Sequence, residues 1–186
     1  YKENTVYRRI GRRMNVHQIE NIPIYLRYLQ ENPLEIDILF KELLINGTNF
    51  FRDDKAFDSL KNNIRDLIIE KSDGDNIRVW VPGCSSGEEV YSIAIIINEL
   101  LEESGKNLDV QIFGTDIDTD AITTARSGTY STSISADVNP ERLKKFFVKK
   151  DNIYIITNHI REMVVFAPHD VIKDPPFTRI DILSCR

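Results

Sequence analysis

The chain has 186 residues, 41% of them hydrophobic and 28% charged, with a formal net charge of −5, which excludes disordered, collagen-like and low-complexity classes. The acidic balance disfavours a nucleic-acid binder, and Cys84 and Cys185 are too few for a disulfide scaffold or zinc cluster, so we expect reduced thiols and no metal. The N-terminus lacks a signal peptide's apolar stretch and the longest apolar run, Val90–Leu101, is broken by polar residues, so we expect a cytoplasmic protein without membrane insertion.

The first part of the chain is expected to be helical. Val6, Ile10 and Met14 recur every four residues, and the arginines lie on the other side of that helical wheel. Three further helices are expected, over residues 24–30, 33–44 and 55–71. Residues 71–76 are polar and have the composition of a turn. We therefore predict an all-helical N-terminal subdomain over residues 1–70.

The charge of the first helix differs from that of the rest of the chain. Residues 1–14 hold five basic side chains and one acidic one, a net charge of +4 that leaves −9 for the other 172 residues. A solvated helix face is the ordinary explanation of such a charge run, but four arginines in an otherwise negative chain favour a surface that meets an acidic partner. The candidates for that contact are Arg8, Arg9, Arg12 and Arg13.

Strand and helix patterns alternate after the polar loop. Strands are expected over 77–81, 110–114, 164–166 and 180–184, and helices over 90–101 and 119–127. This alternation is typical of βαβ units and a parallel sheet, so we predict an α/β domain over residues 71–186. A small antiparallel hairpin, part of a β-subdomain at about 146–166, interrupts it. No helix follows the last expected strand, and we therefore expect the sheet to be incomplete in this chain.

The first expected strand runs into a turn of small residues and then a helix, through Pro82-Gly83-Cys84-Ser85-Ser86-Gly87-Glu88-Glu89. Such a turn lets the backbone approach a nucleotide-like ligand. The glycine spacing is not that of the dinucleotide fingerprint, and no Lys-Ser/Thr follows as in a P-loop. Two glutamates would repel a phosphate but suit a ligand with hydroxyls and a positive charge, a description that S-adenosylmethionine fits. Alternatively, Glu88 and Glu89 only complement the helix dipole.

The second expected strand ends in Thr115-Asp116-Ile117-Asp118. An acidic residue at this place in α/β nucleotide folds binds ribose hydroxyls. The alternative is a helix N-cap. We assign the ribose role to Asp116, which adjoins the strand, and the capping role to Asp118 or Thr119.

A third segment, Asn46-Gly47-Thr48-Asn49-Phe50-Phe51-Arg52-Asp53, joins two expected helices. On composition alone an ordinary loop is the favoured interpretation, with the two phenylalanines in the core and Arg52 paired with Asp53 or Glu42.

Taken together, these motifs resemble the CheR family of chemotaxis receptor methyltransferases. The resemblance is carried by Asn-x-Thr-x-Phe-Phe-Arg, Gly-Cys-Ser-Ser-Gly-Glu-Glu-x-Tyr-Ser and Thr-Asp-Ile-Asp in this order, and by Ala125–Tyr130, Arg142–Phe147 and Asp181–Arg186. It implies a Rossmann-like α/β fold that binds S-adenosylmethionine and methylates glutamate side chains of chemoreceptors, leaving S-adenosylhomocysteine. The chain would then be a protein-glutamate O-methyltransferase in chemotaxis signal transduction, and fused signalling domains are compatible with this interpretation.

The resemblance also implies roles for individual residues. The expected cofactor-binding set is Asn46, Thr48, Arg52, Glu88, Asp116, Asp170 and Val171. Arg52 would lie near the cofactor's carboxylate, and Asp170 and Val171 would flank the adenine, where the family usually has Asn-Leu. A further Asn and Tyr of the family's active site would follow Arg186. The basic first helix would meet the acidic receptor bundle, and the glycine-free hairpin turn suggests no dependence on a receptor tail peptide.

Two other functions are compatible with the sequence. Asp174-Pro175-Pro176-Phe177 looks like the Asp-Pro-Pro-aromatic motif of methyltransferases that act on an amide or amino group, but it precedes a strand instead of following one, so we interpret the prolines as a rigid loop. The other alternative is a non-catalytic module that binds S-adenosylmethionine or receptors.

Overall fold

The computed structural model describes residues 3–43 and 47–185, and the chain divides into two compact units, residues 1–46 and 47–186. The first unit holds the helices α1 (Glu3–Val16), α2 (Ile22–Glu31) and α3 (Pro33–Leu43), as predicted. Pro23 lies in the first turn of α2, where its missing N–H removes no helical hydrogen bond. Met14 and Tyr25 are buried between these helices.

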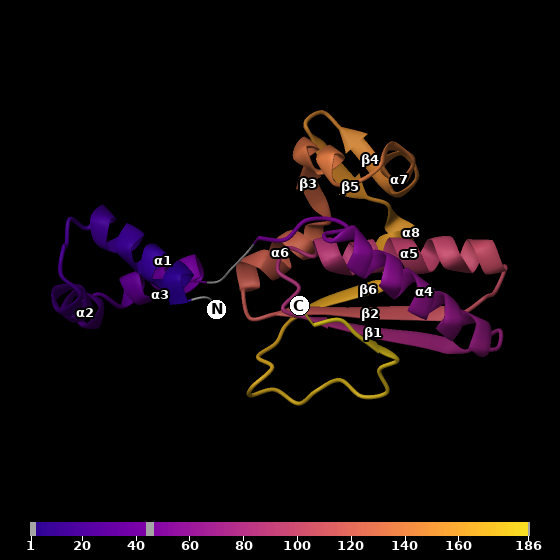
Figure 1. Cartoon of the computed structure of the whole chain (residues 1–186), viewed down its shortest axis with the longest axis horizontal. Coiled ribbons are helices and arrows are strands. Elements are labelled where there is room, and N and C mark those ends of the chain that lie inside the picture. The colour runs from indigo at the N-terminus through magenta and orange to yellow at the C-terminus, as the bar shows by residue number, and fades with distance from the viewer. Residues whose placement is uncertain (1–2, 44–46, 186) are drawn as a thin grey trace. The chain divides into compact units, whose positions relative to one another are not determined.

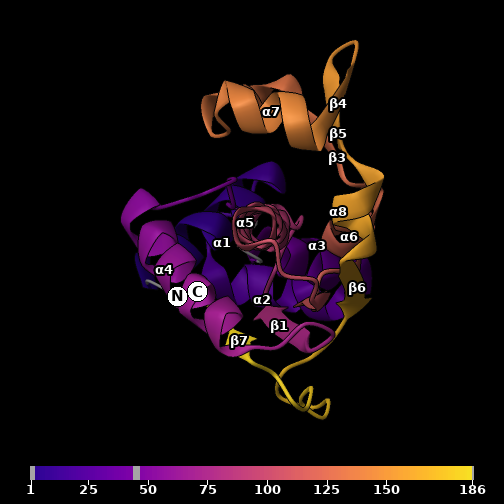
Figure 2. The same cartoon turned by 90° about the vertical axis from the view of Figure 1, so that its right-hand side faces the viewer.

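The second unit is built on a parallel sheet, which confirms the predicted α/β class. Its strands are β1 (Asn76–Pro82), β2 (Asp109–Asp116), β6 (Val164–Pro168) and β7 (Ile182–Leu183). They lie in the order β6-β2-β1-β7, and all three pairings are parallel (Figures 1 and 2).

One face of this sheet is covered by α5 (Glu88–Ser104), which is apolar over most of its circumference and accordingly buried. Alongside α5 runs α4 (Asp54–Glu70), whose Phe57, Ile64 and Ile68 belong to the same hydrophobic core as β1 (Figure 2). Thus α4 is part of the second compact unit, although it falls within the 1–70 stretch expected as the helical subdomain. In the described parts of the chain, no helix combines the length and apolarity needed to cross a bilayer.

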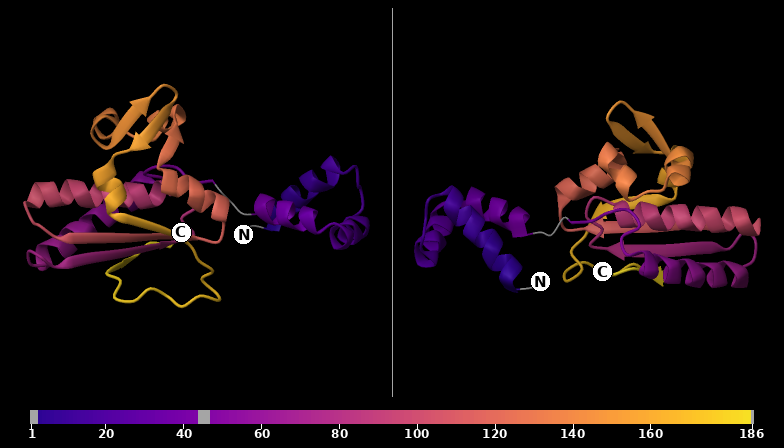
Figure 3. Two further views of the ribbon diagram at one scale, coloured as in Figure 1. Left: turned by 180° about the vertical axis from the view of Figure 1, so that it is seen from behind. Right: turned by 45° about the horizontal axis from the view of Figure 1, so that its top comes forward.

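An irregular segment between β6 and β7, residues 169–181 with a turn at residues 170–174, lies on the opposite face of the sheet (Figure 3). Its Phe177 ring stacks on Phe113 of β2, with centroids 4.5 Å apart, and lies 5.3 Å from the Trp80 ring of β1. The segment therefore shields aromatic side chains that point away from α5.

A small antiparallel sheet stands on the α5 side of the large sheet, with the strand order β3-β5-β4 (Figures 1 and 3). The elements between β2 and β6 are α6 (Thr119–Ser127), β3 (Thr129–Ser131), the 3-10 helix η1 (Thr132–Ala136), α7 (Pro140–Phe146), β4 (Phe147–Lys150), β5 (Ile153–Ile156) and α8 (Asn158–Glu162). The expected hairpin is β4–β5. Its turn works without glycine because Asp151 adopts the left-handed φ of 47°, which aspartate tolerates better than most residues.

Candidate functional site

The carboxyl ends of β1 and β2 lie next to each other, because their parallel pairing runs from Asn76 opposite Asp109 to Pro82 opposite Thr115. Within the sheet, β2 and β6 lie on one side of β1, whereas β7 pairs with β1 on its other side. Ligands of open α/β sheets bind outside the strand ends at such a switch in strand order. The turn of residues 83–87 leaves β1 at this place and enters α5.

The turn has a backbone that requires its glycines. Gly83 and Gly87 have φ angles of 69° and 92°, a region that side chains disfavour. At Gly87 a Cβ would also lie 2.9 Å from Cβ of Ala125 and 3.0 Å from the Phe166 ring. The turn is therefore packed closely against α6 and β6 on one side.

Asp116 joins the end of β2 to this turn. Its Oδ2 accepts a hydrogen bond of 2.7 Å from the Ser85 N–H, and its Oδ1 accepts one of 2.9 Å from the Asp118 N–H. A carboxylate has about four acceptor positions, so two remain for ligand hydroxyls. Asp118 caps α6 by accepting hydrogen bonds from the N–H groups of Asp120 and Ala121. This confirms the capping role that the sequence predicted for Asp118 or Thr119.

Ser85 adds a hydroxyl that sequence reasoning did not single out. Its side chain is buried at 6% exposure, and its Oγ has no hydrogen-bond partner among the described residues. The residue also has a left-handed φ of 49°. A buried hydroxyl without a partner is costly, and at a strand-end turn it is a candidate for bonding to a ligand.

Glu88 lies at the start of α5, where its carboxylate accepts hydrogen bonds of 2.7 and 2.9 Å from the Ser86 hydroxyl. Burial raises the pKa of Glu88 above its usual value, and Asp137 adds to this rise. A positively charged group bound beside Glu88 would relieve this penalty. The site thus favours a cationic ligand over an anionic one.

A hollow of about 300 Å³ next to the first turn of α5 has the same electrostatic character. Asp53 and Glu89 are among its lining residues, together with Ser184, whose Oγ donates to Glu89 Oε1 at 2.7 Å. Acidic side chains therefore surround the beginning of α5 from two sides.

Tyr130 is a second residue that sequence reasoning missed. It extends from β3 and donates its hydroxyl to the Ser86 carbonyl at 2.8 Å. Its ring meets the Phe50 ring edge to face, with centroids 4.9 Å apart. This link between the small sheet and the turn is long-range. In the sequence, Tyr130 stands two residues after the Gly128 cap of α6 and ends the Ala125–Tyr130 segment that carries the family resemblance, but nothing there indicates a contact with Ser86.

The segment before α4 reaches the beginning of α5 through its backbone. Phe50 and Phe51 are buried, as the ordinary-loop interpretation expected. The Phe51 N–H donates to Ser92 Oγ at 3.0 Å, and that hydroxyl donates to the Glu88 carbonyl at 2.7 Å. The structure therefore brings this segment to the first turns of α5.

Other members of the predicted cofactor set lie at the margin of this arrangement. Arg52 is exposed and donates to the Gly47 carbonyl at 2.7 Å, and Thr48 is half-buried. Asn46 lies outside the described residues.

Asp170 and Val171 follow β6 close to Asp116, because the His169 N–H donates to the Asp116 carbonyl at 2.9 Å. The Asp170 carboxylate accepts from the Ile172 N–H and pairs with Lys173, and these contacts lower its pKa. Val171 is 60% exposed.

The Asp-Pro-Pro-Phe stretch has structural contacts. Asp174 accepts a 2.8 Å hydrogen bond from the Asp170 N–H, and Phe177 belongs to the aromatic cluster on the sheet. The motif lies in the segment between β6 and β7 and does not directly follow a core strand, so the rigid-loop interpretation agrees with its setting.

The arginines of α1 differ in their surroundings. Arg13 forms a double hydrogen bond with Glu35, at 3.0 and 2.7 Å, and Glu35 is only 3% exposed. Hydrogen bonds from Arg13, then from Tyr25 and His17, lower the pKa of Glu35 to about 2, against the opposing effect of its burial. Arg12 is exposed and pairs with Glu42, Arg9 donates to the Glu42 carbonyl, and Arg8 is exposed. Arg8 and Arg12 are thus exposed arginines of α1, and the charge of Arg12 is partly balanced by Glu42.

The cysteines are free, as expected, with Cys84 buried in the turn and Cys185 exposed. Burial, followed by the nearby carboxylate of Asp116, raises the pKa of the Cys84 thiol, so this thiol is a poor nucleophile. In the described residues, histidines, cysteines and acidic side chains nowhere gather in a group of three that could hold a metal ion.

Comparisons with known proteins agree with this architecture. Residues 46–186 match the family model for the CheR methyltransferase SAM binding domain, and residues 1–44 match that for the CheR methyltransferase all-alpha domain. The whole chain is 30% identical to a chemotaxis protein methyltransferase of Borreliella burgdorferi and 28% identical to one of Listeria innocua, of which it covers 68% and 69%. It is 39% identical to an uncharacterized 104.1 kDa protein of Rhodobacter capsulatus, but it spans only 20% of that protein's length.

Proposed function

The chain belongs to the CheR methyltransferase family, and on that premise we propose that it transfers a methyl group from S-adenosylmethionine to glutamate carboxylates of chemoreceptors, forming methyl esters. S-adenosylmethionine is the cofactor of the domain that residues 46–186 match. The observation that carries the proposal is the placing of two acidic side chains, Asp116 and Glu88, around one strand-end turn. Asp116 binds the turn through the Ser85 N–H, and Glu88 begins the following helix.

The residues at the turn fit this cofactor by their chemistry. Asp116 retains acceptor positions suited to ribose hydroxyls, and the Ser85 hydroxyl, which bonds to none of the residues that the structure describes, offers another polar contact. Glu88 suits a sulfonium or ammonium group, because burial has already made its isolated charge unfavourable. The turn Gly83-Cys84-Ser85-Ser86-Gly87 carries no lysine or arginine for a phosphate, in keeping with a cofactor that has none.

The reaction asks for positioning more than for acid–base catalysis. Bound S-adenosylmethionine supplies an electrophilic methyl group on a sulfonium and is left as S-adenosylhomocysteine. A glutamate side chain, with an ordinary pKa near 4.3, is already ionised at neutral pH, so no general base is needed. The work of this chain is then to orient the two reactants and exclude water. Tyr130 and Asp116 hold the turn from two sides for that purpose.

We assign the receptor contact to the exposed part of α1. Arg8 presents positive charge to solvent, and Arg12 is exposed beside its partner Glu42, from which an acidic receptor side chain could draw it. This suits the acidic helical bundle of a chemoreceptor. Arg13, whose guanidinium is held by Glu35, supports the helical unit from within.

The test uses S-adenosylmethionine labelled in its methyl group, incubated with membranes that bear chemoreceptors. The protein should transfer label to receptor, and alkali should release the label as methanol, because methyl esters hydrolyse in base. Asp116→Asn should lower the transfer, whereas Asp109→Asn, at the opposite end of β2, should not.

Two results would contradict the proposal. Label that survives alkali indicates an N-methyl product and brings forward the Asp-Pro-Pro-Phe interpretation. Cofactor binding without any transfer, by a version of the chain extended past Arg186 to include the expected Asn and Tyr, indicates a non-catalytic module.

A further inference from the structure

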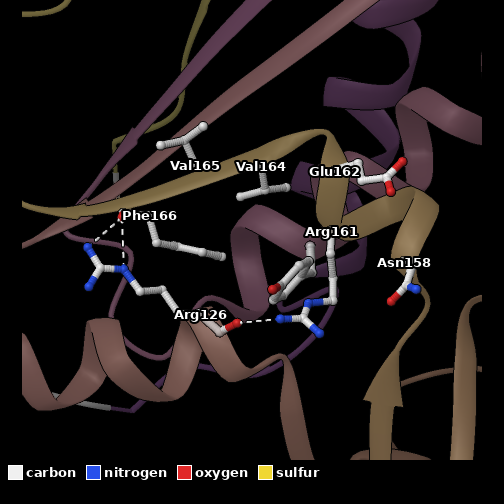
Figure 4. A pocket seen from close by; sticks show the side chains of 8 residues that line it. Arg126, Asn158, Arg161, Glu162, Val164, Val165 and Phe166 are labelled. Carbon is white, nitrogen blue, oxygen red and sulfur yellow. Dashed lines mark hydrogen bonds between the residues drawn. The ribbon is translucent and has the colours of Figure 1, made fainter.

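A second cavity lies at the outer edge of β6, away from the place where Asp116 and Glu88 flank the turn of residues 83–87. Its volume is about 450 Å³, within the usual range for small-molecule sites. Figure 4 shows its lining, which includes Tyr91 of α5, Arg126 of α6, Arg161 and Glu162 of α8, and Val164 and Phe166 of β6. None of these residues belongs to the proposed cofactor set.

The two arginines of this cavity are held in place by backbone carbonyls (Figure 4). Arg126 donates from Nε and Nη2 to the Phe166 carbonyl at 3.1 and 2.9 Å, and Arg161 donates from Nη2 to the Arg126 carbonyl at 2.9 Å. A guanidinium has five N–H donors, and the Nη1 atoms take no part in these bonds. Figure 4 shows the two guanidinium groups at opposite ends of the lining, with that of Arg126 turned to the edge of β6 and that of Arg161 beside Tyr91, to which it is also hydrogen-bonded. Arg161 still has N–H groups beyond these bonds that an anion could accept from.

The same bonds argue against a peptide strand as the occupant. The Ile112 N–H donates to the Met163 carbonyl, so the backbone groups of residues 163 and 165 point towards β2 and those of 164 and 166 point outwards. The outward carbonyl of Phe166 is already bonded to Arg126. The guanidinium thus blocks the edge at which an added strand would bind.

The rest of the lining combines an apolar base with one negative charge. The rings of Tyr91 and Phe166 are buried and meet edge to face, with centroids 5.4 Å apart. Glu162 is exposed on the rim and opposes the two arginines, leaving a net positive charge. An arginine fork matches the paired oxygens of a carboxylate or phosphoryl group.

We propose that this cavity binds a compact small molecule that carries two or more anionic oxygens, as a phosphoryl group or a set of carboxylates, with Arg161 as its main anchor and Arg126 contributing positive charge from the other end of the lining. The site is separate from methyl transfer, and neither proposal depends on the other. Phe166 connects the two regions, since its ring also packs against Gly87 in the turn.

The experiment is calorimetric titration of the full chain with two probes, inorganic pyrophosphate for the phosphoryl chemistry and citrate for the carboxylate chemistry. We expect at least one probe to bind with a submillimolar Kd. Arg161→Gln should weaken that binding about tenfold or more. Glu162→Gln, which removes the opposing charge from an exposed position, should tighten it severalfold.

The matched control is Arg65→Gln, which removes an exposed arginine from α4. It should bind the probe as the parent does. The proposal is overturned if neither probe binds the parent, or if Arg161→Gln binds as well as the parent. Because Arg161→Gln also removes the hydrogen bond to the Arg126 carbonyl, circular dichroism checks that this variant is folded. If it is unfolded, the affinities of Arg161→Lys and Glu162→Gln test the proposal instead. Equal affinity in Glu162→Gln and the parent would then count against the proposal.

Discussion

The replacement Asp116→Asn tests the proposed cofactor site at its most connected residue. In the parent, the two carboxylate oxygens accept from the N–H groups of Ser85 and Asp118 at 2.7 and 2.9 Å. Asparagine keeps one oxygen but turns the other into an NH2 group, which faces an N–H donor and cannot accept from it. The replacement therefore removes one charge-assisted hydrogen bond within the protein and also one oxygen that could accept from a ribose hydroxyl of the cofactor. Such bonds contribute about 1.5–3 kcal/mol each.

At 1.4 kcal/mol per factor of ten, this loss predicts a Kd for S-adenosylmethionine about 10- to 100-fold higher than in the parent. Calorimetric titration measures it directly, and S-adenosylhomocysteine provides a second ligand with the same ribose. The control is Asp109→Asn, an exposed aspartate at the start of the same strand. A Kd for Asp116→Asn within twofold of the parent value would refute the assignment of this residue to the cofactor.

Four further predictions follow from the described contacts. Arg13→Ala should destabilise the helical unit by about 3–5 kcal/mol in urea denaturation, because it leaves the buried Glu35 carboxylate without its main partner. Arg8→Ala should leave stability unchanged and slow receptor methylation. Equal losses of stability in the two variants would contradict the assignment of Arg13 to stability and Arg8 to receptor contact. Because the pKa of Glu35 is lowered to about 2, its contribution is present above its unfolded pKa near 4.5 and should disappear as pH falls from there towards 2. Glu88→Gln should reduce severalfold the preference for S-adenosylmethionine over S-adenosylhomocysteine, which lacks the sulfonium charge. Because burial raises the pKa of the Glu88 carboxyl, that preference should rise with pH in the parent and not in the variant. An unchanged ratio of the two Kd values would count against a contact between Glu88 and the cationic end of the cofactor. Gly114→Ala places a Cβ 2.6 Å from the Phe166 ring and should cost about 1–3 kcal/mol of unfolding free energy, whereas a parental urea midpoint would show that the ring can move aside.

The sequence predicts the local elements of this fold well, because the signals for them lie within a few residues. The alternation of apolar residues in β1 and the polar stop at residues 71–76 define a strand and the loop before it. The turn after β1 is recognisable by its two glycines, both of which have positive φ. Asp118 is recognisable as a cap from its place directly before α6.

Contacts between distant segments were beyond such reasoning. The basic run in α1 was interpreted from its own composition, and nothing within it indicates that Arg13 pairs with a buried glutamate 22 residues later. In the same way, the apolar face of α4 shows that this helix packs against something, but not that its partner is α5.

The candidate site follows the same rule. Asp116 and Glu88 were identified because each stands at the end or start of an element in a known kind of turn. Tyr130 was missed because its bond to the Ser86 carbonyl spans 44 residues and depends on how the small sheet stands over α5. The cavity at β6 combines side chains from four elements, and no sequence motif joins them.

The central claim is tested most directly by locating the transferred methyl group. Receptor-bearing membranes incubated with the protein and S-adenosylmethionine are digested, and the receptor peptides are sequenced by tandem mass spectrometry under acidic conditions that preserve esters. We expect methyl groups on glutamate side chains in the acidic helical bundle, and fewer of them with Asp116→Asn. Methyl groups on nitrogen atoms of lysine, asparagine or glutamine side chains would contradict it.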